Sequence, residues 1–264
     1  MKLHIVPARQ GAIWVRLGIR VFVRQPLAMS GLFFMFIAVV SALSLIPVVG
    51  SVLALAVIPA ATLGYMAATH EAIQGKFPMP TLLLSAFRAG RERLRDMLIL
   101  GAWYAMAFLG VMGLSVMIDG GTFANLYLIG GKLDAEVISQ PAFLTAMYLS
   151  LALYIPISLA FWHAPALVHW HGLSPLKSLF FSAVACFKNL GAFTVYGMLW
   201  FGLMLTTGLT VSLLGALIGG ATVAGALMMP AILVIASMFF CSLFFTFHDC
   251  FITEPDSDKP PPEV

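Results

Sequence analysis

The chain has 264 residues, of which 61% are hydrophobic and 9% are charged, and its mean hydropathy is +1.00. Soluble domains are only about 45–50% apolar, so the composition excludes an ordinary soluble domain and indicates an all-α polytopic membrane protein. The net charge is +3, and the basic residues cluster beside apolar runs. This placement favours anionic lipid headgroups over nucleic acid as the partner. The three cysteines include no CxxC pair, so they predict neither a disulfide framework nor a thiolate metal site.

The N-terminal segment is basic and precedes the first long apolar run. Its basic residues are Lys2, Arg9, Arg16, Arg20 and Arg24. This even spread differs from a cleavable signal peptide, where one basic cluster precedes a short apolar core. The last three arginines form a narrow stripe on an otherwise apolar helix that contains Trp14 and Phe22. We therefore expect an amphipathic helix at the membrane interface before the first span.

Six apolar runs are long enough to cross a bilayer, which takes about 20 residues each. They lie at about residues 27–46, 51–72, 97–118, 142–170, 190–214 and 221–247. With six spans, residues 1–26, 73–96, 171–189 and the C-terminal tail share one side of the membrane. That side holds 13 of the 14 Lys and Arg residues, and the other side holds only Lys132. The positive-inside rule then predicts that both termini are cytoplasmic.

The charged connector "TLLLSAFRAGRERLRDML" (Thr81–Leu98) is predicted to form an interfacial helix as well. Its apolar stripe consists of Leu83, Phe87, Gly90 and Leu94. A second face carries Arg88, Glu92 and Arg95, and Arg91 lies between the two faces. Two interpretations of these basic residues, and of Lys188 in the next connector, stay open. Either the residues determine topology alone, or they also bind anionic lipids or a partner.

An internal repeat is indicated by residues 75–87, which align without gaps to residues 172–184 at an offset of 97. The offset superposes Pro59 on Pro156, Gly75 on Gly172 and Pro78 on Pro175, and Pro230 gives the sixth span a similar proline. We infer three units, about 8–72, 76–170 and 173–250, each an interfacial helix followed by a hairpin of two spans. Chance similarity between apolar segments is the alternative.

The three units are expected to form one integral-membrane domain, residues 1–252. Residues 253–264, "EPDSDKPPPEV" after Thr253, are acidic, proline-rich and poor in apolar side chains. Such a composition cannot bury enough apolar surface to fold, so we expect a disordered cytoplasmic tail.

The segments "PARQGAIWVRLGIRVFVRQPLAMSGLFF" and "LIPVVGSVLALAVIPAATLGYM" (Leu45–Met66) resemble a family of betaproteobacterial inner-membrane proteins to which no activity is assigned. The resemblance extends to about Phe251. It implies a multi-pass protein of the bacterial inner membrane, and it implies nothing about catalysis.

No catalytic signature is present among the common motifs: the sequence has no GxxxxGK[ST], GxSxG or HExxH. No acidic or basic residue lies near the middle of a span, which argues against carboxylate-coupled transport. His163 is the deepest titratable residue, and a lone buried histidine is more often structural. We therefore expect neither an enzyme nor a cofactor.

Histidines lie near the cytoplasmic ends of the even-numbered spans. The residues are His70, His169, His171 and His248, and Asp249 follows the last of them. If the repeat brings these ends together, neutral imidazoles and a carboxylate could bind a divalent metal. The alternative is that they are membrane-interface anchors.

These observations favour a protein that organises lipids or partners at the cytoplasmic leaflet, in a role such as envelope maintenance. The alternative is a transporter or channel for an apolar or weakly polar solute, because prolines within spans can break helices and line a cavity. Membrane lipids with anionic headgroups are the expected partners. The identity of protein partners is not predicted, and a homo-oligomer stays open.

Overall fold

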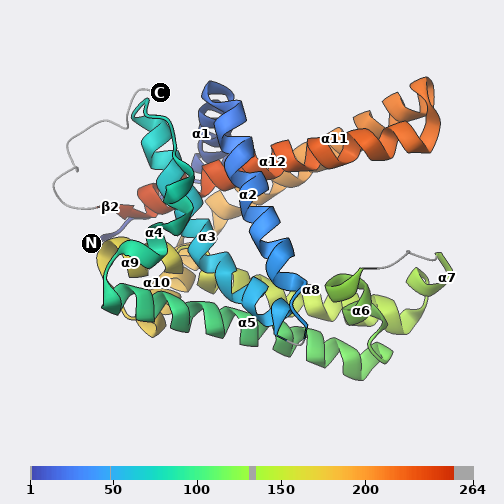
Figure 1. Cartoon of the computed structure of the whole chain (residues 1–264), viewed down its shortest axis with the longest axis horizontal. Coiled ribbons are helices and arrows are strands. Elements are labelled where there is room, and N and C mark those ends of the chain that lie inside the picture. Colours follow the sequence, from blue (N-terminus) through green and yellow to red (C-terminus); the bar gives the residue numbers. More distant parts are fainter. Residues whose placement is uncertain (1, 48, 131–134, 253–264) are drawn as a thin grey trace. The chain divides into compact units, whose positions relative to one another are not determined.

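The structure, a computed structural model, describes residues 2–47, 49–130 and 135–252. Nearly all of these residues are helical (Figure 1). In chain order the elements are β1 (Lys2–Leu3), α1 (Gln10–Arg24), α2 (Pro26–Ser44), α3 (Gly50–Ile73), the 3-10 helix η1 (Pro80–Leu84), α4 (Ser85–Arg88), α5 (Arg91–Asp119), α6 (Thr122–Ile129), α7 (Ala135–Ile138), α8 (Pro141–Phe161), α9 (Ala164–His171), α10 (Pro175–Lys188), α11 (Leu190–Ile218), α12 (Gly220–Cys250) and β2 (Phe251–Ile252).

Six helical stretches in the described residues are long and apolar enough to cross a membrane. Five of them are the single helices α2, α3, α5, α11 and α12, and the sixth consists of α8 and α9 together. The predicted all-α fold with six spans is therefore confirmed. The third span differs most in length from its prediction, because α5 begins at Arg91 and the predicted span begins at about residue 97. The predicted disordered tail and Lys132 lie outside the described residues.

The described chain divides into two compact units. Unit 1 holds the residues up to Ala38, Ala60–Ala89 and the chain from Val184 onwards, and unit 2 holds Val39–Pro59 and Gly90–Ala183. This division passes through α2, α3 and α10, so it does not follow the three consecutive units inferred from the repeat. The single domain, the three hairpins and their leading interfacial helices stay predictions.

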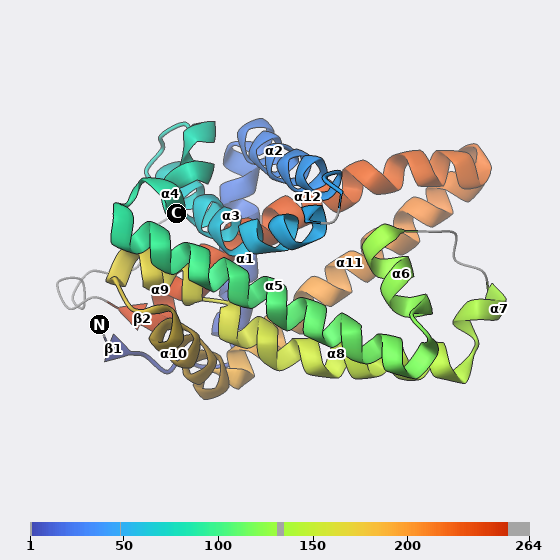
Figure 2. The same cartoon turned by 60° about the horizontal axis from the view of Figure 1, so that its bottom comes forward.

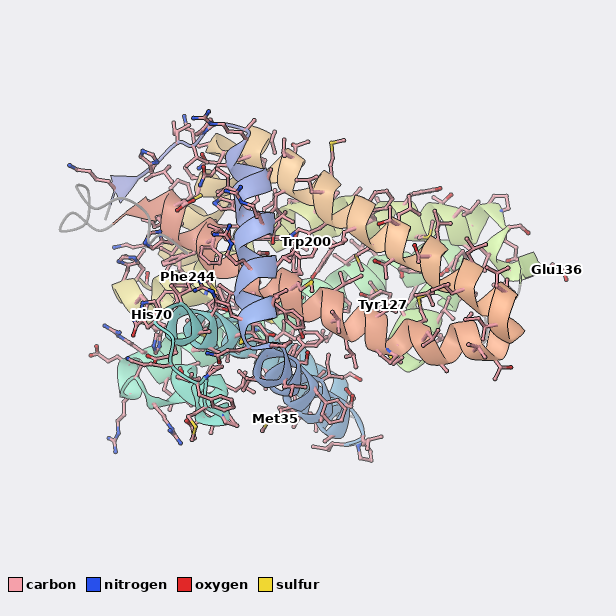
Figure 3. All side chains as sticks on the ribbon, turned by 90° about the horizontal axis from the view of Figure 1, so that it is seen from above. Met35, His70, Tyr127, Glu136, Trp200 and Phe244 are labelled. Atoms are coloured by element: carbon pink, nitrogen blue, oxygen red, sulfur yellow. The ribbon has the colours of Figure 1, made fainter. Side chains whose placement is uncertain are left out.

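Unit 1 is built on α11 and α12, which run side by side, and α1 packs across both of them (Figures 1 and 3). The tilted and edge-on rings of Phe33, Tyr65 and Phe240 join α2, α3 and α12, with centroids 5.3–6.1 Å apart. The Tyr65 hydroxyl donates to the Met29 carbonyl oxygen at 2.9 Å. Such a bond satisfies a buried hydroxyl that lipid could not.

Unit 2 is built on α5 and α8, which also run side by side (Figure 2). Its core contains Phe108, Val111 and Met112 of α5 and Ala124 of α6. The hydroxyls of Tyr104 and Tyr154 lie 2.8 Å apart between α5 and α8. The two hydroxyls thus form one hydrogen bond with each other inside an otherwise apolar core.

The charged connector does not form the continuous helix predicted over Thr81–Leu98. Helix η1 and the short α4 end before Gly90, whose φ is +95°, and α5 starts at the next residue. Only glycine adopts such a φ without strain, so its presence in the predicted apolar stripe breaks the helix. As a result, Arg91 and Arg95 belong to the first turns of a span rather than to an interfacial helix.

Candidate functional site

The basic face of α1 is the first of two places where predicted lipid-contacting residues gather. Arg16 and Arg24 are exposed and Arg20 is half-buried. On the other side of the helix, Trp14 is 0% and Phe22 is 5% exposed. Because α1 packs on α11 and α12, its apolar face contacts protein rather than lipid. The sequence did not reveal that α11 and α12 cover the apolar face of this helix.

Two glycines allow α1 to approach the spans of unit 1 closely. A Cβ atom at Gly11 would overlap the Ala192 carbonyl oxygen and lie 2.8 Å from the Tyr196 nitrogen. A Cβ atom at Gly18 would lie 2.5 Å from Cβ of Ser242. Both distances are far below van der Waals contact, so α1 crosses α11 and α12 at two positions where only glycine fits.

A partly buried polar contact fixes the same helix to the end of α12. The carboxylate oxygen Oδ2 of Asp249 accepts a hydrogen bond from Trp14 Nε1 at 2.7 Å and another from Gln10 Nε2 at 2.6 Å. The Trp14 ring also contacts the Phe193 and Tyr196 rings of α11, with centroids 5.3 and 6.0 Å apart. Asp249, which was predicted as a metal ligand, thus uses one oxygen to hold α1.

The segment before α1 is fixed to unit 1 by Asn189, which is 2% exposed. Its Oδ1 accepts from the Val6 nitrogen at 2.8 Å, and its Nδ2 donates to the carbonyl oxygens of His4 and Ala185 at 3.1 and 3.0 Å. Next to it, β1 pairs antiparallel with β2 in the register Lys2↔Ile252. The start of the chain and the end of α12 therefore form one fixed structure.

The start of α5 in unit 2 is the second basic place. Arg91 and Arg95 are exposed and lie four residues apart, on one face of the helix. Arg93 lies on the opposite face and donates from Nη1 to the His169 carbonyl oxygen in the last turn of α9. A cation at a helix C-terminus is favourable because the carbonyl ends there carry partial negative charge. The two faces of this arginine cluster thus have different structural roles.

The remaining predicted basic residues lie at helix ends. Arg88 is exposed in the last turn of α4, and Lys188 is exposed in the last turn of α10. A basic side chain in a last turn also interacts favourably with the helix dipole. Their positions fit topology determinants as well as lipid contacts, so both interpretations stay open for them.

The histidines gather only in part. In unit 1, His70 and His248 both lie against the Phe244 ring, with centroids 5.4 and 5.9 Å away. Figure 3 labels His70 and Phe244. His248 Nδ1 is 3.3 Å from Asp249 Oδ1. His169 and His171 belong to α9 in unit 2. Among the described residues, no group of three or more His, Cys, Asp or Glu could hold a metal ion, so the structure supplies no ligand group for the metal hypothesis.

The predicted structural residues keep similar roles at the two ends of the repeat. Pro59 lies inside α3 and Pro156 inside α8. Gly75 and Gly172 follow the ends of α3 and α9 with φ values of +75° and +64°, a conformation that ends helices and favours glycine. Pro230 lies inside α12.

The second proline of each repeat differs between the two copies. Pro175 begins α10 as predicted, because proline is well tolerated at the first helical position. Pro78 instead lies two residues before η1, which itself begins at Pro80. The fourteen-residue helix α10 thus has no continuous counterpart in the first copy.

A break in the fourth span separates α8 from α9. His163 is fully buried at this break, and Pro165 follows in the first turn of α9. Ser182 of α10 spans the interruption: its hydroxyl accepts from the His163 nitrogen at 2.9 Å and donates to the Leu159 carbonyl oxygen at 2.9 Å. A serine thus satisfies backbone groups that the break leaves without helical partners.

Several of these residues were not identified from the sequence. Asn189, Ser182 and Arg93 each bond to backbone atoms far away in the sequence, so no local pattern reveals them. Gly11 and Gly18 did have a signal. They lie seven residues apart, on the same face of α1 as Trp14, and small residues on one face indicate close helix packing.

Comparison with known proteins agrees with this membrane architecture. A Burkholderia thailandensis protein named "Probable inner membrane protein" is 40% identical over 265 residues, which cover 99% of this chain and 98% of that protein. No protein-family model matches the chain. No solved structure matches it either. The resemblance to inner-membrane proteins and the multi-pass inner-membrane location are therefore confirmed.

Proposed function

The chain belongs to the family of this Burkholderia inner-membrane protein, and we propose that it binds anionic phospholipids at the cytoplasmic leaflet and organises lipids or partners there without catalysis. The two basic places, on α1 and at the start of α5, are its lipid-contacting surfaces. Both termini lie in the cytoplasm in this proposal, because 13 of the 14 Lys and Arg residues then face the side where they are retained.

The geometry of α1 is the observation that carries the proposal. Only Gln25 separates the end of α1 from the start of α2, so Arg24 lies next to the membrane end of a span. Arg16 and Arg24 are exposed, while the opposite face is fixed by Gly11 and Gly18 against α11 and α12. This packing holds the two arginines in place. Each basic residue near an anionic leaflet contributes about 1 kcal/mol to the attraction between protein and membrane.

One observation favours a second candidate function, a transporter or channel for an apolar or weakly polar solute. The fourth span is broken at His163, and broken helices build substrate sites in transporters. At this break, however, Ser182 already occupies the His163 nitrogen and the Leu159 carbonyl oxygen. A solute would have to compete with these bonds, so we rank this function second.

The lipids that surround the protein in its own membrane test the proposal. The full-length protein is extracted from a bacterial inner membrane in polymer discs, and the lipid composition of the discs is compared with that of the bulk membrane. We expect anionic phospholipids to be enriched around the wild type, and the enrichment to fall in the Arg16→Ala/Arg24→Ala variant. A disc composition equal to that of the bulk membrane contradicts the proposal.

A further inference from the structure

A shallow, open groove lies along one face of the first three turns of α5, within unit 2. Figure 2 shows this helix. The groove has a volume of about 420 Å³, and it is open on its outer side. The residues that line it are Arg91, Leu94, Arg95, Leu98, Ile99 and Ala102. Their spacing of three, one, three, one and three residues places all six on one face of the helix.

The polarity of the groove changes along its length. The two arginines lie near the end where the span begins. The other four lining residues are apolar: Leu94, Leu98, Ile99 and Ala102. Arg95 and Ala102 are seven residues apart, which corresponds to roughly 10 Å along a helix. One leaflet of hydrocarbon is roughly 15 Å thick. With the start of α5 at the membrane surface, the groove has a cationic entrance near the headgroups and an apolar slot beside the acyl chains.

The two arginines are available at this entrance. Among the residues that the structure describes, no ion pair includes Arg91 or Arg95. The neighbouring Arg93 instead holds the end of α9 from the opposite face. Guanidinium groups bind phosphate through paired hydrogen bonds. The backbone nitrogens at the start of α5 add partial positive charge at the same end.

We propose that this groove binds one anionic phospholipid, with the phosphate on Arg91 and Arg95 and one acyl chain along Leu98, Ile99 and Ala102. An acidic protein segment fits less well, because it would place charged groups against the apolar slot. The inference rests on the proposed function and deepens it, since it turns a general attraction to the leaflet into a stoichiometric site.

Native mass spectrometry of the full-length protein in mild detergent tests the site. The probes are phosphatidylglycerol, cardiolipin and phosphatidylethanolamine, each added at matched concentrations. We expect the wild type to retain one phosphatidylglycerol or cardiolipin molecule and to bind phosphatidylethanolamine at least about tenfold more weakly. The Arg91→Ala/Arg95→Ala variant should lose at least about tenfold in affinity for the anionic lipid, because it loses both phosphate contacts.

Two further variants separate a site from general surface charge. Ala102→Trp keeps every charge but fills the slot, and it should also weaken the retained lipid. Arg9→Ala/Lys177→Ala removes two exposed basic residues outside the groove and should leave the retained lipid unchanged. An unaffected Ala102→Trp variant, or an equal loss in the Arg9→Ala/Lys177→Ala variant, overturns the proposal. If a 10-fold excess of inorganic phosphate displaces the lipid, phosphate and lipid bind with about equal affinities, by mass action. That result overturns the acyl-chain part of the proposal and identifies a phosphate site.

The failure of this site and the failure of the proposed function give different results. If polymer discs are enriched in anionic lipids but no lipid is retained through Arg91 and Arg95, the groove proposal is wrong and the general function stands. If the discs show no enrichment, the proposed function itself is wrong.

Discussion

Asn189 shows how one buried side chain can organise distant segments. It bonds to the backbone of residues 4 and 6 and to the end of α10, and its Nδ2 lies 3.5 Å from Cys250 Sγ. A buried amide in this position satisfies backbone groups of a segment that has little regular structure of its own. Its sequence neighbours give no sign of this role, because every partner but one is more than 60 residues away.

Replacing Asn189 by alanine should destabilise the protein and release the N-terminal segment. The Val6 nitrogen and the His4 carbonyl oxygen lose their partner. Both bonds are only partly buried, so each loss should cost less than the about 1–3 kcal/mol of a fully buried unsatisfied group. We expect a lower Tm and faster amide hydrogen exchange in residues 2–6. Thr194→Ala is the matched control, because its exposed hydroxyl bonds only within α11. Equal exchange in the two variants would show that Asn189 does not hold this segment.

The Cys186 thiol gives a useful property at the same scale. Burial raises the pKa of this thiol well above its ordinary value, and a nearby thiol at Cys250 adds to the effect. The other two cysteines, Cys241 and Cys250, are buried as well. Neutral buried thiols react slowly with alkylating reagents. The native protein therefore offers a low background for labelling at introduced cysteines.

At the scale of elements, the sequence predicted the spans well and the connectors poorly. The apolar runs determine α2, α3, α11 and α12 because crossing hydrocarbon leaves a continuous helix as almost the only solution. The connector over Thr81–Leu98 has no such constraint, and a single residue, Gly90, decides where its helix breaks. The helical period of the apolar residues does not reveal this break. A glycine at a position of the apolar stripe is compatible both with a continuous helix and with a helix end.

The candidate site was predicted in the same uneven way. The arginines of α1 and α5 were identified because charge is rare in this chain. The division of roles between Arg93 and its neighbours at 91 and 95 depends on α9, which only the folded chain places beside α5. His70 and His248 both contact the Phe244 ring, which the sequence did not reveal.

The crossing of α1 over α11 and α12 leads to a prediction at this scale. Gly11→Ala should push α1 away from α11, because the new methyl group would overlap the Ala192 carbonyl oxygen. Overpacking of this kind costs about 1–3 kcal/mol, so we expect a clearly lower Tm for the purified protein. Gly31→Ala in α2 is the control, since a Cβ atom there meets nothing within 4 Å. Equal Tm values for the two variants would contradict the close crossing.

At the scale of the whole molecule, the account depends on which side of the membrane the basic residues face. The two lipid-contacting surfaces can act on the cytoplasmic leaflet only if α1 and the start of α5 face the cytoplasm. The loop between α5 and α6 must then face the opposite side, because α5 crosses the membrane. The charge distribution supports this orientation, and a direct measurement can decide it.

The most direct measurement is labelling of single introduced cysteines in intact cells with a thiol reagent that does not cross the inner membrane. Arg16→Cys, on the exposed face of α1, and Thr122→Cys, at the exposed start of α6, report the two sides. We predict that Thr122→Cys is labelled in intact cells and that Arg16→Cys is labelled only after the membrane is opened. Labelling of Arg16→Cys in intact cells would contradict the account, because the basic surfaces would then face away from the cytoplasmic leaflet.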